Sequence, residues 1–351
     1  MAPVVRALRS LVPLLATVAG IACAPPSATG PATSDPDTAR AVDPPVCAAV
    51  DPAGVAACVD PARYAADLRF VAQPRPPGSA HHIRVQAMCA EVFERAGYDV
   101  VVDRYRTGTN VLGVREGDES AWVLYGAHYD HLPGCDGADD NASGVAAVLE
   151  LSRVLAAIPT RRTIAFACWD EEERGLVGSR DWARRLSAAA IDVSLYVNFD
   201  AIAFADDRPD TQAIPTGFGL LFADEVERLR DRQSRADFIA LVADPKGAPF
   251  ASLIETYGQS QQLPAALLEI PQLVKDSGLV YDLQRSDHAS LWDVGVGAVM
   301  ITDTAEFRSD AYHCRDREDD VDSLDLTFAT RVVRATAAAS AHLLAESAPT
   351  K

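Results

Sequence analysis

The fold of this chain is decided by residues 121–157, which read AWVLYGAHYD HLPGCDGADD NASGVAAVLE LSRVLAA. The apolar run Ala121–Tyr125 predicts a short buried strand, and the apolar spacing within Ala142–Ala157 predicts a helix. Between them lies a polar, glycine-containing loop that carries His128 and Asp140. A strand, a loop with reactive side chains and a helix in this order indicate an α/β sheet with helices packed on it.

The same alternation continues on both sides of this stretch. Further strands are predicted at Asp99–Tyr105, Asn110–Val114, Thr163–Cys168, Ser194–Phe199 and Gly297–Thr302. Further helices are predicted at Tyr64–Val71, His81–Ala96, Val177–Ala190 and Asp325–Ala345. Residues 201–285 show little pattern, and we expect a variable insertion there. These elements predict an α/β sheet layered between helices, with no internal repeat.

Composition excludes one large class of function. The chain has 351 residues, 48% of them hydrophobic, which is enough for a substantial core. Its formal net charge is -18, whereas a nucleic-acid-binding surface must be basic to match the phosphates. We therefore expect no nucleic-acid partner.

The first residues predict export. Residues 1–23 have basic residues ahead of the apolar run Leu11–Ile21 and small residues after it, which is typical of an export signal peptide. The run is too short to span a bilayer comfortably, so we expect no transmembrane span. Cleavage before Cys23 would leave a lipid anchor and cleavage after Ala24 would not; both remain open. We expect a periplasmic or cell-surface lipoprotein, or a secreted protein.

The remaining chain divides into two parts. Residues 24–60 are rich in Pro and Ala without sustained periodicity, which predicts a linker or a prosegment, and residues 61–348 form the predicted domain. Six cysteines besides Cys23 suggest disulfides in an oxidising compartment. We expect bridges between Cys47 and Cys58 and between Cys135 and Cys314, and we expect Cys89 and Cys168 to be buried thiols. The alternative, that all six are reduced, stays open.

Five short segments each carry a side chain that binds metal ions. Besides His128 and Asp140, these are Glu172 and Glu173, Asp200 and His288. Two imidazoles and three carboxylates suit zinc, and a shared carboxylate can hold two ions about 3.5–4 Å apart. Three of the segments follow predicted strands, and ligands gather beyond the carboxyl ends of strands in open α/β sheets. The pattern predicts a metal-dependent hydrolase, although an acidic run such as Asp170–Glu173 alone is more often a solvated loop.

The order of these segments resembles the M28 family of di-zinc aminopeptidases. The resemblance rests on HYD at 128–130, GADDNASG at 137–144, EERGL at 172–176, NFD at 198–200 and SDH at 286–288, and it covers most of residues 62–345. It implies a single globular domain with a central mixed, mostly parallel β-sheet sandwiched between helices, as in zinc exopeptidases. It also implies peptide substrates and two Zn²⁺ ions. Co²⁺ and Mn²⁺ are possible substitutes, because sites with nitrogen and oxygen ligands follow general affinity trends rather than strict selection.

The resemblance further implies a role for each ligand. Asp140 would bridge the two ions, His128 and Asp200 would complete the site of one, and Glu173 and His288 would complete the other.

The resemblance and the chemistry also suggest roles beside the ions. Glu172 would be the general base that takes a proton from the metal-activated water during release of N-terminal residues. The carboxylate of Asp130 is expected to accept the second N–H of the His128 imidazole and so fix its orientation. His131 is expected in the wall of the site, and a substrate contact is one possibility for His313.

Other functions remain open at this stage. A glutaminyl cyclase-like enzyme with a single zinc ion would use Asp140, Glu173 and His288, and a carboxypeptidase of the same fold is a further relative. A non-catalytic binding domain with a decayed site is disfavoured because every ligand and the base are present. Substrate side-chain preference, oligomeric state and the natural metal are not determined by the sequence.

Overall fold

The computed structural model describes residues 47–275, 277 and 280–346, and within them eight strands form one sheet in the order β1-β2-β4-β3-β5-β8-β6-β7. The strands are β1 (Asp99–Arg104), β2 (Thr109–Arg115), β3 (Glu119–His128), β4 (Arg162–Trp169), β5 (Asp192–Phe199), β6 (Ile239–Ala243), β7 (Ala265–Glu269) and β8 (Ala298–Thr302). Pairings β3–β4, β3–β5, β5–β8 and β6–β7 are parallel, and β1–β2, β2–β4 and β6–β8 are antiparallel. This confirms the mixed, mostly parallel sheet.

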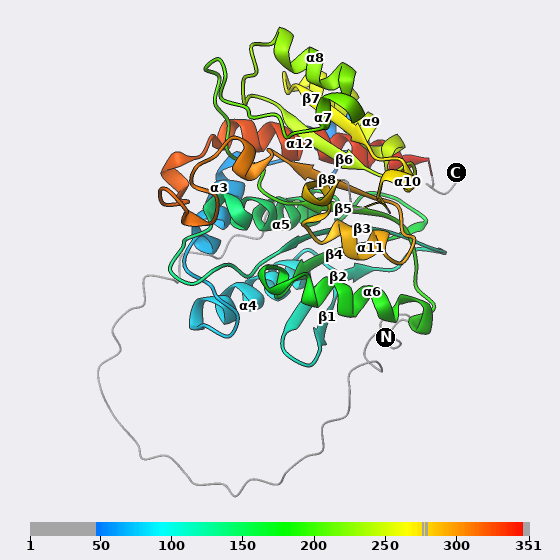
Figure 1. The fold of residues 1–351 in the computed structure, drawn as a ribbon. Helices are drawn as coiled ribbons and strands as arrows, with labels where there is room; N and C mark the ends of the chain where they lie inside the picture. Colours follow the sequence, from blue (N-terminus) through cyan, green and yellow to red (C-terminus); the bar gives the residue numbers. More distant parts are fainter. Residues whose placement is uncertain (1–46, 276, 278–279, 347–351) are drawn as a thin grey trace, which may run out of the picture.

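Helices cover both faces of the sheet (Figure 1). One core joins the sheet to α3 (Pro61–Val71), α4 (Ala80–Arg95), α5 (Gly144–Val154), α9 (Ala248–Ser260) and α12 (Leu326–Ala345). The other joins it to α6 (Val177–Ala189) and α11 (His288–Trp292). Along β3, Val123 and Tyr125 enter the first core and Trp122 and Leu124 the second, because successive side chains of a strand point to opposite faces.

The shorter elements complete the description. They are α2 (Pro52–Ala57), α7 (Phe218–Leu221), α8 (Ala223–Asp231) and α10 (Gln272–Lys275), a π-helical turn η2 (Ala138–Ser143), and the 3₁₀ turns η3 (Glu172–Arg174), η4 (Tyr281–Gln284), η5 (Ala305–Phe307), η6 (Tyr312–Cys314) and η7 (Val321–Ser323). None of the helices in the described part of the chain has the length and apolar character needed to cross a membrane.

Side-chain caps explain where three of the long helices begin. Asp60, Ser79 and Asp325 each accept a backbone N–H of the first turn of α3, α4 and α12. Such a cap satisfies a donor that has no partner inside the helix.

The helices and strands predicted from the sequence lie within a few residues of the observed ones.

Residues 201–285 correct the expectation of a mere insertion. They contain β6, α9 and β7, and β6 pairs with β8, so the segment extends the central sheet. Both strands are only five residues long, and most side chains of β7 are partly exposed. Neither strand therefore has the long apolar or strictly alternating pattern that makes a strand recognisable in a sequence.

The N-terminal segment and the cysteines bring two further corrections. Residues 47–60, expected in a linker or a prosegment, contain α2, which packs on α12. Residues 1–46, with the expected export signal and Cys23, lie outside the described residues.

Disulfides Cys47–Cys58 and Cys135–Cys314 confirm the expected bridges. Cys89 and Cys168 are bonded to each other rather than free. Their pairing depends on α4 lying over β4, which no local pattern reveals.

Candidate metal centre

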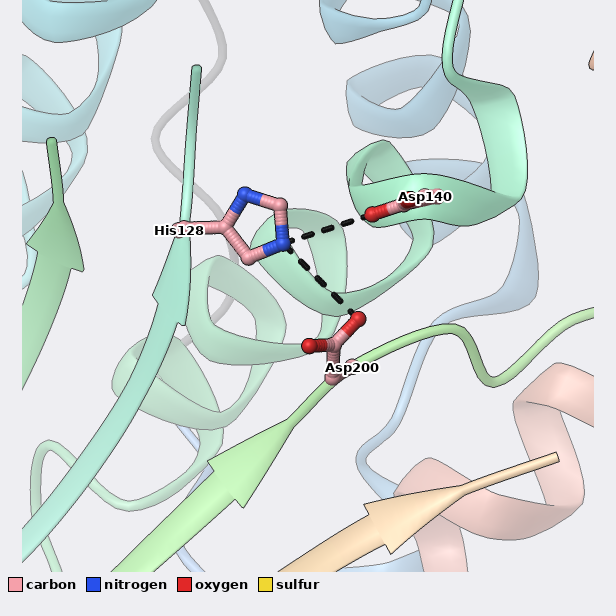
Figure 2. A group of neighbouring side chains, drawn as sticks. All are labelled: His128, Asp140 and Asp200. Carbon is pink, nitrogen blue, oxygen red and sulfur yellow. Dashed lines mark ion pairs between the residues drawn. The ribbon is translucent and has the colours of Figure 1, made fainter. Parts of the chain in front are cut away.

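The candidate residues gather at the carboxyl ends of the parallel strands. His128 is the last residue of β3, Asp200 directly follows β5, and the Glu172–Glu173 turn follows β4. Figure 2 shows one ring nitrogen of His128 facing the carboxylates of both Asp140 and Asp200. His128 Nε2 lies 3.3 Å from Asp140 Oδ1 and 3.7 Å from Asp200 Oδ1. Strand β3 and its neighbour β5 thus carry the imidazole and one carboxylate to the same point.

The orientation of the His128 ring is set by its other nitrogen. Nδ1 lies 3.2 Å from the backbone carbonyl oxygen of Asp130, and a carbonyl can only accept, so Nδ1 carries a proton and Nε2 is the nitrogen that faces the two carboxylates. The Asp130 carboxylate, expected in this role, is 3.7 Å from the same nitrogen, beyond hydrogen-bond distance. Its two oxygens accept the backbone N–H groups of Glu172 at 2.9 Å and Glu173 at 3.3 Å. Asp130 therefore positions both the imidazole and the glutamate turn.

A second group of ligand atoms shares Asp140 with the first. His313 Nε2 lies 3.2 Å from Asp140 Oδ2 and 3.4 Å from Glu173 Oε2. His131 Nδ1 lies 2.8 Å from Glu173 Oε1. Ligand atoms of His128, Asp140 and Asp200 lie within 4.8 Å of one another, and so do those of His131, Asp140 and Glu173. Asp140 directs one oxygen toward each group, so its carboxylate can serve two cations.

His288 lies apart from both groups, which corrects its expected role. Its Nε2 is 2.9 Å from the carbonyl oxygen of Leu283, and its ring packs edge-on against Trp292 at 4.5 Å. The side chain is fully buried at the start of α11. The imidazole next to Glu173 comes from His313 instead. A sequence signal for this existed, because the expected Cys135–Cys314 bridge ties the neighbour of His313 to the loop before Asp140.

Burial and charge push the carboxyl groups of the site in opposite directions. Burial alone would raise the pKa of Asp140, but the imidazoles of His128 and His313 hold that pKa well below its usual range. Burial raises the pKa of Glu172 well above its usual range; His128 opposes this shift, and the charge of Asp200 adds to it. These opposite pKa shifts distinguish Asp140, which stays ionised, from Glu172, which can exchange a proton.

Two buried residues that the sequence did not single out hold the ligand loops. Arg75 donates to the carbonyl oxygens of Tyr129, Gly137 and Asp140 at 2.9, 2.8 and 3.3 Å. The carboxylate of Asp319 accepts the backbone N–H groups of Asp139 and Asp140. Arg75 thus ties the loop after β3 to the η2 turn, while Asp319 orients the start of that turn.

The two groups of candidate ligand atoms that share Asp140 open into a cleft, and this cleft adjoins an apolar pocket. The cleft is lined by His128, Asp140, Glu172, Glu173, Asp200, Tyr281, Tyr312 and His313, among others. The pocket lies between residues 212–232 and the sheet, and its apolar lining includes Ile214, Phe218, Phe222, Val242, Ala266, Leu268 and Met300. Asp200, Arg285 and Tyr312 line both. A molecule bound at the ligand groups can therefore extend an apolar group into the pocket.

Comparison with known proteins gives a family match. The model of peptidase family M28 matches residues 110–340. YfbL of Escherichia coli, an uncharacterized protein, is 29% identical over 269 residues, 70% of this chain and 77% of its own length. The probable lipoprotein aminopeptidase LpqL of Mycobacterium tuberculosis is 42% identical over 97 residues, 27% of this chain and 19% of its own length. The chain thus spans most of YfbL but only a small part of LpqL.

Solved structures share the fold at low identity. The aminopeptidase LapA of Legionella pneumophila has a TM-score of 0.61 at 17% identity, covering 84% of this chain and 74% of its own. A glutaminyl cyclase of Fimbriiglobus ruber has a TM-score of 0.54 at 17% identity, covering 80% and 94%. These likenesses establish the fold and leave the reaction to be argued from the side chains.

Proposed function

Because the chain belongs to peptidase family M28, and is thus a hydrolase of the metallo-exopeptidase class, we propose that it is a two-zinc aminopeptidase that removes N-terminal residues from peptides. The observation that carries this proposal is the placement of Asp140, whose two oxygens face two separate imidazole–carboxylate groups. A single-ion enzyme has no use for a carboxylate shared in this way.

The donor atoms fit zinc at both positions. Donors about 2.0–2.1 Å from a tetrahedral zinc ion lie about 3.3 Å apart. The separations around Asp140 are 3.3 Å to His128 and 3.2 Å to His313. One ion would be held by His128, Asp140 and Asp200, and the other by Asp140, Glu173 and His313. Bound ions of this kind polarise a carbonyl and lower the pKa of water to near neutrality.

Glu172 is the residue that moves the proton in this proposal. It is buried in the same cleft, outside both ligand groups, with its backbone N–H held by Asp130. Burial raises its pKa, which makes the carboxylate a stronger base, so it can accept a proton from the attacking water and deliver that proton to the leaving amine.

The surroundings of the ligand groups support selection of a peptide N-terminus. The carboxylates of the cleft can hold the ammonium group of a substrate, and the adjoining apolar pocket can take the first side chain. We therefore propose a preference for peptides that begin with an apolar residue. A role at the cell surface or outside the cell is part of the proposal, since three disulfides suit an oxidising compartment.

The second candidate is a glutaminyl cyclase-like enzyme with one zinc ion. The fold shared with the cyclase of Fimbriiglobus ruber supports it. It would leave the His128–Asp200 pair without a purpose, so metal content separates the two: near two ions per chain for the aminopeptidase and near one for the cyclase.

The test combines metal analysis with aminoacyl 4-nitroanilide substrates. We expect hydrolysis that a chelator abolishes and zinc restores. Glu172→Gln should keep two ions and lose a factor of about 10²–10⁴ in kcat. The control is Glu171→Gln, because Glu171 pairs with Arg174 and Thr107 instead of facing the cleft; it should stay within a few-fold of wild type. Turnover unaffected by the chelator, or full activity of Glu172→Gln, would contradict the proposal.

A further inference from the structure

We propose that His131 is an additional ligand of the ion held by Asp140, Glu173 and His313. That ion then has four protein ligands, whereas the ion held by His128, Asp140 and Asp200 has three. This inference rests on the proposed function, because it requires that cations bind at both groups.

The position of the His131 ring is the first argument. The residue is fully buried, and its Nδ1 lies 2.8 Å from Glu173 Oε1. Ligand atoms of His131, Asp140 and Glu173 lie within 4.8 Å of one another. The ring also lies edge-on to that of His313, with centroids 6.0 Å apart. Two imidazoles therefore approach the same pair of carboxylates.

The second argument is the lack of hydrogen bonds among these atoms. Within the described residues, His131 Nδ1 and Nε2 and Glu173 Oε1 have no hydrogen-bond partner, although Nδ1 and Oε1 are close enough. Their angles are wrong for a hydrogen bond between them. A buried polar atom without a partner costs free energy, about 1–3 kcal/mol, and such atoms call for an explanation. A cation shared by Nδ1 and Oε1 supplies one.

The third argument is that the chain makes room for the ring. Gly137 has a φ of +56°, and a Cβ at this position would come within 2.4 Å of His131 Cδ2. The backbone N–H of His131 donates to the carbonyl oxygen of Arg75 at 3.3 Å. The Cys135–Cys314 disulfide joins the loop that follows His131 to the turn that carries His313. The loop is thus built to hold both imidazoles against Glu173.

The consequence is an asymmetric pair of ion sites. A zinc ion with four protein ligands has little room for a further molecule, whereas one with three keeps an open position. The position open to substrate then lies at the His128 group, beside the apolar pocket that Asp200 also lines.

The experiment detects the nitrogen–metal bond directly. Protein labelled with ¹⁵N-histidine is loaded with ¹¹³Cd²⁺, and NMR counts the imidazoles that show ¹¹³Cd–¹⁵N coupling. We expect three in the wild type, from His128, His131 and His313, and two in His131→Gln. The variant should also bind one of its two ions at least about tenfold more weakly by competition with a chromogenic chelator. His288→Gln, the control, removes a buried imidazole outside both groups and should keep all three couplings.

Two results would overturn the inference in distinguishable ways. If the wild type binds two cadmium ions and shows only two coupled imidazoles, His131 merely positions Glu173 and the proposed function stands. If the wild type binds fewer than two ions, the proposed function fails, and the inference fails with it. Both results come from the wild-type protein, so the test does not depend on whether the variant folds.

Discussion

At the residue scale, two adjacent aspartates have different roles. Asp139 and Asp140 are neighbours in the chain and both are buried. Asp140 faces the imidazoles of His128 and His313, whereas Asp139 accepts the backbone N–H of Ala203 at 2.8 Å. Burial, together with the charge of Asp303, raises the pKa of Asp139 well above its usual range. Of the two, only Asp140 thus stays ionised and available to a cation.

His288 supplies a prediction about pH. Burial lowers its pKa from 6.5 to about 4, because the charged imidazole loses its hydration. The unfolded chain therefore takes up the proton at higher pH than the folded protein does. This contribution to stability is complete above pH 6.5 and is lost as the pH falls toward 4. This shift in the pKa of His288 corresponds to at most about 3 kcal/mol in the free energy of unfolding.

The measurement compares urea unfolding of wild type and His288→Gln at pH 7 and pH 4.5. Many other groups titrate in this interval, so the quantity of interest is the difference between the two proteins. We expect the wild type to lose more of its free energy of unfolding on acidification than the variant does. Equal losses in the two proteins would show that His288 does not titrate in this way.

At the element scale, the late strands of the sheet decide what lies beside the ligands. β6 and β7 extend the sheet past β8, and residues 212–232 cross over this part of the sheet. The apolar pocket lies between them, and most of its apolar walls come from elements that carry no candidate ligand, whereas Asp200 and Tyr312 join it to the cleft. Substrate preference can therefore vary with this segment while the ligand loops stay unchanged.

Filling the pocket should change substrate preference in a predictable direction. Ala266 lies on β7 and lines the pocket. In Ala266→Phe the added ring should lower kcat/KM for leucine 4-nitroanilide by about 10–200-fold, since the fit of even one methylene group in an apolar pocket is worth about 1–3 kcal/mol. The alanine substrate should change little, because its side chain does not reach the added ring.

The control for this variant is Ala188→Phe, an equal change at an exposed position of α6. It should leave both substrates unaffected. If Ala266→Phe reduces leucine and alanine turnover equally, the pocket does not receive the first side chain.

At the scale of the whole molecule, covalent links join parts that are distant in the sequence around the site. Cys135 and Cys314 are separated by 179 positions and link the loop after His131 to the turn of His313. Cys47–Cys58, with a sequence separation of 11, closes a short loop that contains α2. Both bridges restrict the unfolded chain, but only the first joins segments that carry candidate ligands.

Removing each bridge should therefore have different effects. We expect Cys135→Ser/Cys314→Ser to lower the free energy of unfolding by about 2–4 kcal/mol and to weaken binding of one zinc ion. Cys47→Ser/Cys58→Ser should lower stability without changing zinc affinity. Thermal unfolding and competition with a chromogenic chelator measure the two quantities. Equal zinc affinity in both variants would contradict a role for Cys135–Cys314 in holding the centre.

The sequence alone determined the α/β class, the positions of most helices and strands, and the loops that carry His128, Asp140, Glu173 and Asp200. This was possible because apolar periodicity and strand ends are local properties, written within each element. Tertiary structure decided which imidazole stands opposite Glu173, which cysteine faces Cys89, and how residues 201–285 form a pocket. These contacts depend on packing between segments far apart in the chain, and a local sequence pattern does not predict which distant segment will lie beside it.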